Sequence, residues 1–294
     1  IQDCNKALEM NPRYAHAYTN RGNAYRLKGN YVQAIQDFNK ALEIDPGFDM
    51  AYNNRGITFN SRGEHDRAFQ DYNKALEINP RLGDAYNNRG NIFVEKGDYD
   101  RAIQDYNKAL EVNSRDFNAY YNLGIVFADK EDNERAIQYY SKAIELNPKY
   151  ADAYNNRGNI LSSKEDYDRA IQDFSKAIEL NPRHEAAYFN RGNIFGDKGE
   201  YDRAIQDYNK ALEINPRDAD AYNNRGYVLN NKGEYSRALQ DYKKAIELNP
   251  SLKDAYNSLG WLYATCPQPQ YRNGVEAVSM AIKACELTQW QDWS

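Results

Sequence analysis

The chain has 294 residues, of which 28% are charged and 41% hydrophobic, and its formal net charge is -5. This negative balance offers no basic surface to a nucleic-acid backbone, so we expect no nucleic-acid partner. No apolar run approaches the roughly 18 residues that a membrane-spanning helix needs, so we also expect no membrane partner.

From Ala15 onward the sequence repeats itself with a step of 34 residues, marked by the tripeptide Asn-Arg-Gly at Asn20, Asn54 and Asn88. Self-similarity at this period predicts a solenoid in which each unit contacts its neighbours. Residues 1–14 then form the second helix of a truncated repeat, and 253–294 form an atypical repeat with an insertion and the start of a truncated further helix. Seven complete units lie between them, at 15–48, 49–82, 83–116, 117–150, 151–184, 185–218 and 219–252.

Two helical faces recur within each unit, which we number from position 1 to position 34. Gly occupies position 8 in all eight units, Ala occupies positions 20 and 27, and aromatic residues favour positions 4, 11 and 24. This spacing predicts two amphipathic helices, with small residues receiving the large rings. We expect the first helix to end at a glycine and a proline to stand in the first turn of the following helix. The glycines are Gly29, Gly63, Gly97, Gly199 and Gly233, and the prolines are Pro46, Pro80, Pro148, Pro182, Pro216 and Pro250.

This set of residues resembles the tetratricopeptide repeat (TPR). The resemblance implies an all-α fold, a right-handed superhelical solenoid of antiparallel helix pairs. In the last unit, Ala277 and Ala284 fill positions 20 and 27 only if about five residues are inserted near Cys266. That variant resembles the terminal units of some bacterial repeat proteins, which favours a bacterial source.

Arg at position 7 coincides with Asp at position 23 in six units, as in Arg89 and Asp105. The two units with Leu at position 7 have Tyr139 and, by the shifted alignment, Met280 at position 23. A competing partner for Asp105 is Arg101, one turn earlier on the same helix. Because the first pairing recurs more consistently, we predict an Arg–Asp bridge between the two helices of a unit.

Asn fills position 6 in seven consecutive units, and the family resemblance places this position in the concave groove. An amide can donate to a peptide C=O and accept from a peptide N–H at once. The row is similar to the asparagine ladder in the repeat domain of O-linked N-acetylglucosamine transferase, which implies an extended polypeptide ligand. The alternative is that these amides bond nearby helix groups or water and were copied by duplication. The row comprises Asn20, Asn54, Asn88, Asn122, Asn156, Asn190 and Asn224.

Neighbouring positions widen this polar strip and interrupt it with aromatic rings. Asp at position 2, as in Asp84 and Asp220, gives the groove a negative bias, which favours a neutral or basic segment. The rings predict apolar pockets that select ligand side chains. The further candidate residues are Asn53, Asn87, Asn91, Asn159 and Asn193 for the strip, and Tyr121, Phe189, Tyr227 and Trp261 for the pockets.

No catalytic motif rises above the repeat background, so we expect no enzyme activity in this chain. Cys4, Cys266 and Cys285 are too scattered for a disulfide framework or a metal site, and we expect neither metal nor cofactor. The favoured function is a protein-interaction scaffold that binds an extended segment. The alternative is the substrate-recognition array of a larger enzyme or regulatory protein, whereas a solenoid that reads RNA is disfavoured by the acidic groove.

The chain begins without Met and in mid-repeat, which indicates a fragment and leaves the compartment open, with the cytoplasm slightly favoured. We expect the unit 117–150 to act as a hinge of the array, because Glu131 replaces the turn glycine, Asn133 replaces the usual Tyr at position 17, and Ser114 replaces the preceding proline. Trp290 and Trp293 are expected to start a further helix. Exposed apolar ends predict end-to-end self-association of the fragment.

Overall fold

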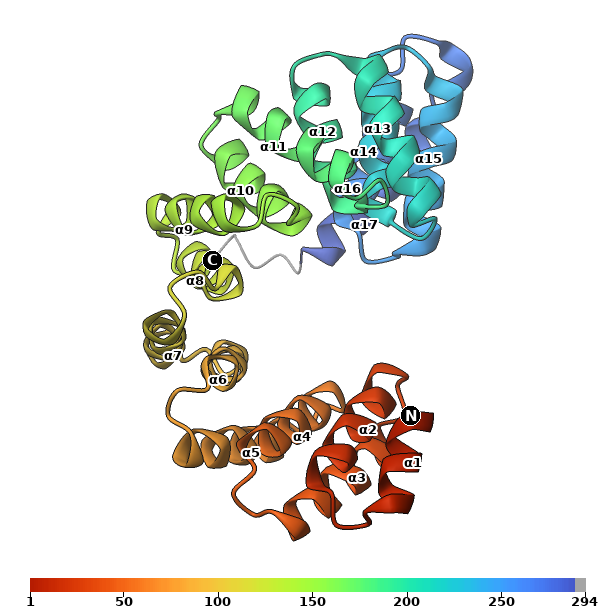
Figure 1. Cartoon of the computed structure of the whole chain (residues 1–294). Helices are drawn as coiled ribbons and strands as arrows, with labels where there is room; N and C mark the ends of the chain where they lie inside the picture. The colour runs from red at the N-terminus through yellow and green to blue at the C-terminus, as the bar shows by residue number, and fades with distance from the viewer. Residues whose placement is uncertain (289–294) are drawn as a thin grey trace. The chain divides into compact units, whose positions relative to one another are not determined.

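The structure is a computed structural model of the chain, and it describes residues 1–288. Trp290 and Trp293 therefore lie outside the described residues. The regular structure within this range is entirely helical (Figure 1). The residues gather into two compact units, one spanning Ile1–Pro148 and the other starting at Lys149, and each is described by itself. The first unit contains α1 (Gln2–Met10), α2 (Ala15–Leu27), α3 (Tyr31–Ile44), α4 (Asp49–Ser61), α5 (His65–Ile78), α6 (Gly83–Glu95), α7 (Tyr99–Val112), α8 (Phe117–Asp129) and α9 (Asn133–Leu146).

The second unit continues the same alternation of a 13-residue helix and a 14-residue helix until its atypical last repeat. Its helices are α10 (Ala151–Ser163), α11 (Tyr167–Leu180), α12 (Glu185–Asp197), α13 (Tyr201–Ile214), α14 (Ala219–Asn231), α15 (Tyr235–Leu248), α16 (Lys253–Thr265), the short 3₁₀ helix η1 (Pro269–Tyr271) and α17 (Gly274–Leu287).

The turn between the two helices of a repeat requires a left-handed residue. Gly29 has φ 77° and the four equivalent glycines have similar values, which confirms that they end the first helices. Glu131 and Glu165 take the same conformation with φ 59° and 61°, although a side chain disfavours it. The fourth and fifth repeats therefore carry backbone strain at a point where the other repeats have none.

The expected position of the prolines was wrong. Pro46 lies in the turn after α3, three residues before α4 begins at Asp49. The preceding residue, Asp45, is extended with φ -134° and ψ 92°. Proline disfavours helical backbone in the residue before it, so it stops the second helix rather than starting the next first helix.

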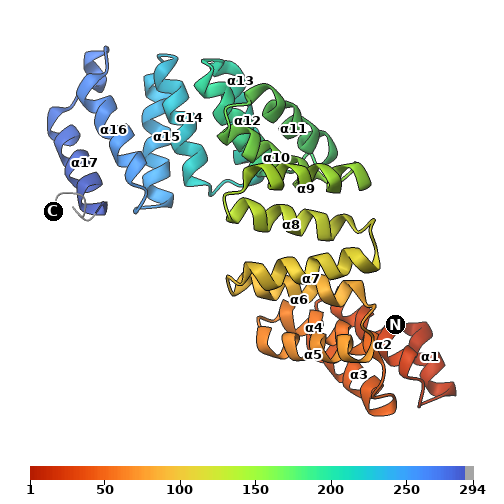
Figure 2. The ribbon, with the colours of Figure 1, turned by 90° about the vertical axis from the view of Figure 1, so that its left-hand side faces the viewer.

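Each first helix packs against the second helix of its repeat, and within each compact unit that second helix packs against the next first helix. Figure 2 shows this order from α14 to α17. The position-24 rings fill the space above the position-8 glycines: a Cβ placed on Gly56 would lie 2.6 Å from Cε1 of Tyr72. The alanines at positions 20 and 27 are almost fully buried, so the pattern of small residues and rings forms the core.

The predicted bridge between the helices of a repeat is confirmed. Arg89 donates from Nε to Asp105 Oδ2 and from Nη2 to Oδ1, both at 2.7 Å, and Asp105 is 5% exposed. The competing Arg101 pairs with Asp98 at the start of α7 instead. The same bidentate contact joins Arg21 to Asp37, Arg55 to Asp71, Arg157 to Asp173, Arg191 to Asp207 and Arg225 to Asp241.

These arginines also reach the preceding repeat, a contact that the repeat pattern did not predict. Arg89 Nη1 donates to Asn73 Oδ1 at 2.8 Å, and Asn73 is the position-25 residue of the repeat before. Each such guanidinium therefore joins three helices rather than two. Equivalent contacts are Arg21 to Asn5, Arg55 to Asn39, Arg191 to Ser175 and Arg225 to Asn209.

The last repeat keeps the packing despite its insertion. Ala277 and Ala284 of α17 are buried at 9% and 3% exposure, as the shifted alignment expects. Met280 packs against the buried cluster that contains Leu259, so the apolar pairing of positions 7 and 23 holds here. Among the residues described, no helix combines the length and the hydropathy needed to span a membrane.

Candidate functional site

The position-6 asparagines, which we call the amide row, stand on the first helices of seven successive repeats. Asn20 is exposed, and the other members are half-buried. Gly at position 8 and Ala at position 3 of each first helix are buried, whereas position 6 keeps contact with solvent. The row therefore lies on the part of the first helices that the core packing leaves accessible. Its members are Asn20, Asn54, Asn88, Asn122, Asn156, Asn190 and Asn224.

Several members of the row are hydrogen-bonded to an amide in the preceding repeat. Asn122 Nδ2 donates to Oδ1 of the position-9 residue Asn91 at 3.1 Å. The same contact joins Asn190 to Asn159 at 2.8 Å and Asn224 to Asn193 at 3.0 Å. These bonds fix the orientation of the row, and each uses one of the two N–H groups of a carboxamide.

Where position 9 is apolar, the row finds a different acceptor. Ile57 occupies position 9 in the second repeat, and Asn88 Nδ2 donates to Oδ1 of the position-5 residue Asn53 at 3.0 Å. The amides thus bond helix-borne groups, as the alternative interpretation of the row expected. Because each amide also has acceptor lone pairs, these contacts leave capacity for a further partner.

The position-5 asparagines are buried, which the sequence did not reveal. Asn53, Asn87, Asn155 and Asn223 are between 6% and 8% exposed. Asn87 Nδ2 donates to Asp116 Oδ2 at 2.5 Å, whereas Oδ1 of Asn87 and of Asn223 is buried with no hydrogen-bond partner. These amides lie beneath the accessible surface, so position 6 presents more of its polar atoms than position 5 does.

The position-9 asparagines connect the row to the core. Tyr106 donates its hydroxyl to Asn91 Oδ1 at 2.7 Å, and Tyr208 does the same to Asn193 Oδ1 at 2.7 Å. Burial raises the pKa of Tyr106, so its phenol stays protonated as a donor. Asn91 Oδ1 therefore accepts from both Tyr106 and Asn122, which couples a core ring to the amide row.

In the first compact unit, a pocket lies beside the asparagines at positions 6 and 9. A pocket of about 340 Å³ is lined by residues that include Asn91, Asn122 and Tyr106. Of the four rings predicted to form pockets, Tyr227 and Trp261 are 53% and 68% exposed, and Phe189 lies with its ring centroid 6.0 Å from that of the core residue Tyr208. Tyr121 is half-buried, with its ring centroid 5.8 Å from that of the core residue Tyr140.

Negative charge gathers at the start of the first helices in the second compact unit. The pKa of Glu185 is raised to about 7 by its burial and by the adjacent carboxylate of Asp218. The pKa of Asp220, whose side chain is only partly buried, is raised by this desolvation and by the carboxylates of Asp218 and Asp254. Across residues 1–288, no three or more His, Cys, Asp or Glu side chains group in a way that could hold a metal ion.

Three family models, all for the same repeat, match the chain. The model described as tetratricopeptide repeat matches residues 15–48, 50–82, 117–150, 151–184 and 219–252. A model described as TPR repeat matches 90–131 and 192–233, and a further tetratricopeptide repeat model matches 71–104 and 174–206. A comparison with curated proteins found no match.

Solved structures with the same architecture include YrrB, a TPR protein with an unusual peptide-binding site. It is 30% identical and covers 63% of this chain and 95% of its own, with a TM-score of 0.53. The MamA protein is 30% identical over 57% of this chain and 92% of its own, with a TM-score of 0.52. Cut9–Hcn1 from the APC/C is 19% identical over 96% of this chain and 51% of its own, with a TM-score of 0.69, and shows likeness of fold alone.

Proposed function

Because the chain belongs to the tetratricopeptide repeat family, we propose that it is a protein-interaction scaffold whose amide row binds an extended polypeptide segment through its backbone. The peptide-binding site described for YrrB supports a ligand of this class. The recurrence of one amide at one position in seven repeats suits a ligand that is itself repetitive, and the backbone is the repetitive part of a polypeptide.

The observation that carries this proposal is the orientation of the row by the preceding repeat. Asn122 and Asn224 each have a side-chain N–H fixed on a position-9 amide. An ordered carboxamide loses less conformational entropy when a ligand binds than a free one does. The remaining donor and acceptor atoms can then pair with a peptide C=O and N–H, whatever side chain that residue carries.

The acidic residues on the same face set the charge of the partner. Asp84, Asp152, Asp220 and Asp254 occupy position 2, and all four are exposed. A segment with Lys or Arg is favoured there over an acidic one, and salt should weaken the preference. The scaffold should therefore bind neutral or basic extended segments.

A peptide array incubated with the wild-type chain and with the triple variant Asn88→Ala, Asn122→Ala, Asn156→Ala tests the proposal. Each lost hydrogen bond contributes about 0.5–1.5 kcal/mol, so we expect the triple variant to bind captured peptides at least about tenfold more weakly. The array identifies the peptides, and fluorescence anisotropy measures their affinities.

The matched control is Asn107→Ala, which removes an exposed asparagine from α7, a second helix of its repeat. It should leave the affinities unchanged. If the triple variant is folded by circular dichroism and keeps full affinity for every captured peptide, the amide row does not bind the backbone.

A further inference from the structure

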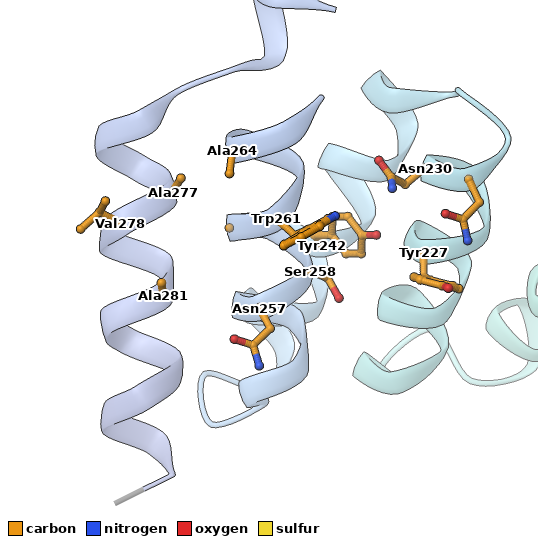
Figure 3. A pocket seen from close by; sticks show the side chains of 12 residues that line it. Tyr227, Asn230, Tyr242, Asn257, Ser258, Trp261, Ala264, Ala277, Val278 and Ala281 are labelled. Atoms are coloured by element: carbon orange, nitrogen blue, oxygen red, sulfur yellow. The ribbon is translucent and has the colours of Figure 1, made fainter. Parts of the chain in front are cut away.

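A second hollow lies in the second compact unit, between α14, α16 and α17 (Figure 3). It has a volume of about 720 Å³, and its lining is mainly apolar. Trp261 and Ser258 point from α16 toward α14, and Ala277 and Ala281 of α17 face α16. Trp261 is 68% exposed, a large fraction for a tryptophan with apolar surroundings.

Two of the side chains that line the hollow are aromatic rings at position 9. Tyr227 and Trp261 occupy this position in consecutive repeats, where other repeats have Asn91 or Asn193. The position-24 ring below them, Tyr242, lines the hollow together with Ser258 of the neighbouring repeat. The two exposed rings and the small side chains of α17 leave a space large enough for a bulky side chain.

Carboxylates stand on the same helix faces as these rings. Asp220 precedes Tyr227 by seven residues on α14, and Asp254 precedes Trp261 by seven residues on α16. Residues seven apart share a helix face and lie about 10 Å apart along the axis. Partial burial and the neighbouring carboxylates of Asp218 and Asp254 raise the pKa of Asp220, so three carboxylates act on one another at this end of the helices.

The amide row runs between the carboxylates and the rings. On α14, Asn224 comes four residues after Asp220 and three before Tyr227, which corresponds to about 6 Å and 4.5 Å along the helix. Beside it, Asn223 Oδ1 is buried and has no hydrogen-bond donor. An extended chain that follows the row would direct successive side chains to opposite sides, one toward the rings and the next toward the carboxylates.

We propose that this part of the groove selects a segment in which a bulky aromatic residue is adjacent to Lys or Arg. The aromatic side chain occupies the hollow beside Tyr227 and Trp261, and the basic side chain meets Asp220 and Asp254. This selectivity rests on the proposed function, because the backbone between the two side chains is held by the amide row.

Labelled nine-residue peptides of Ser and Gly provide the probes, and anisotropy with the full chain provides the measurement. The first peptide carries adjacent Trp and Lys, and the second separates them by one Ser so that both point to the same side. In the third, Ser replaces Trp, and in the fourth, Glu replaces Lys. We expect the first peptide to bind about tenfold more tightly than each of the others.

Two sets of variants assign the preference to its groups. Trp261→Ala should abolish the advantage of Trp over Ser, and Asp220→Asn with Asp254→Asn should abolish the advantage of Lys over Glu. Trp261→Phe should retain part of the first advantage. Equal affinity of the wild type for all four peptides, or preferences that survive in these variants, would overturn the inference.

Asn224→Ala separates this inference from the proposed function. If the variant binds every peptide as tightly as the wild type while the Trp and Lys preferences remain, backbone binding by the row fails and the selectivity stands. If it weakens all four peptides equally and the wild type shows no preference, only the selectivity fails. Absence of binding to any peptide would refute both. Self-association in sedimentation that Trp261→Ala removes would assign the hollow to a second copy of the chain and also overturn the inference.

Discussion

Replacing Asp105 by Ala is expected to destabilise the third repeat by about 2–3 kcal/mol. Removing one partner of a buried ion pair costs about 3–5 kcal/mol. We expect a loss below that range because the Arg89 side chain keeps 21% exposure, so water can solvate part of the unpaired charge. The substitution leaves a guanidinium that lies between three helices, with a hydrogen bond to Asn73 and the ring of Tyr86 but no carboxylate beside it. Hydrogen exchange of α6 and α7 measures this local opening directly, without assuming that the whole array unfolds in one step.

The fourth repeat supplies the template for restoring stability. Its position 7 is Leu123, fully buried, and its position 23 is Tyr139, which stacks on Phe127 with ring centroids 5.2 Å apart. The double variant Arg89→Leu, Asp105→Tyr should therefore cost less than either single change, because no unpaired charge remains. Lys108→Ala, in an exposed pair on the same helix, should change the exchange little. Additive effects of the two single changes at Arg89 and Asp105 would contradict the bridge.

Gly124→Ala is expected to destabilise the fourth repeat by about 1–3 kcal/mol, although alanine normally favours a helix. The added Cβ would lie 2.6 Å from both Cδ1 and Cε1 of Tyr140. That ring is 2% exposed, so it has no free space into which it could move. Thermal unfolding followed by circular dichroism should show a lower melting temperature.

The same substitution elsewhere in the chain provides graded controls. At Gly192 the new Cβ would lie 3.1 Å from Tyr208 Cε1, so the cost should be smaller than at Gly124. At Gly83 the nearest atom is 3.6 Å away, an ordinary contact, and Gly83→Ala should be neutral or mildly stabilising. Equal melting temperatures for the three variants would contradict the idea that contact with the position-24 ring is what requires glycine at position 8.

The repeat made much of this architecture predictable, because each position is sampled several times in nearly the same surroundings. The joint occurrence of Arg at position 7 and Asp at position 23 predicted a contact between residues 16 apart, which Arg89 and Asp105 make. The exceptions were equally informative, since Met280 packs against the buried cluster that contains Leu259. Recurrence within one chain thus replaced a comparison between relatives.

The contacts between repeats were harder to predict, because they depend on side-chain rotamers and on how one repeat is displaced from the next. Arg89 could have used one partner or two, and only the structure shows its bond to Asn73. The burial of Asn53 and Asn223 at position 5 was missed for the same reason. The helical pattern tells in which direction a side chain points, but not how closely the neighbouring repeat covers it. The prediction for Pro46 was wrong for a different reason. A proline indicates that a helix boundary is near, but the sequence does not tell whether α3 ends there or α4 begins there.

Recognition of a peptide backbone by the amide row, rather than of particular side chains, is the central feature of the proposed function. The most direct measurement is the affinity of a captured peptide in which each backbone nitrogen is methylated in turn, which removes one N–H donor per peptide. The proposed function predicts a loss of about tenfold at several positions, whatever side chain each carries, and a smaller loss in the Asn88→Ala, Asn122→Ala, Asn156→Ala variant. Affinity that is insensitive to methylation at every position, but lost when single side chains are truncated, would contradict it.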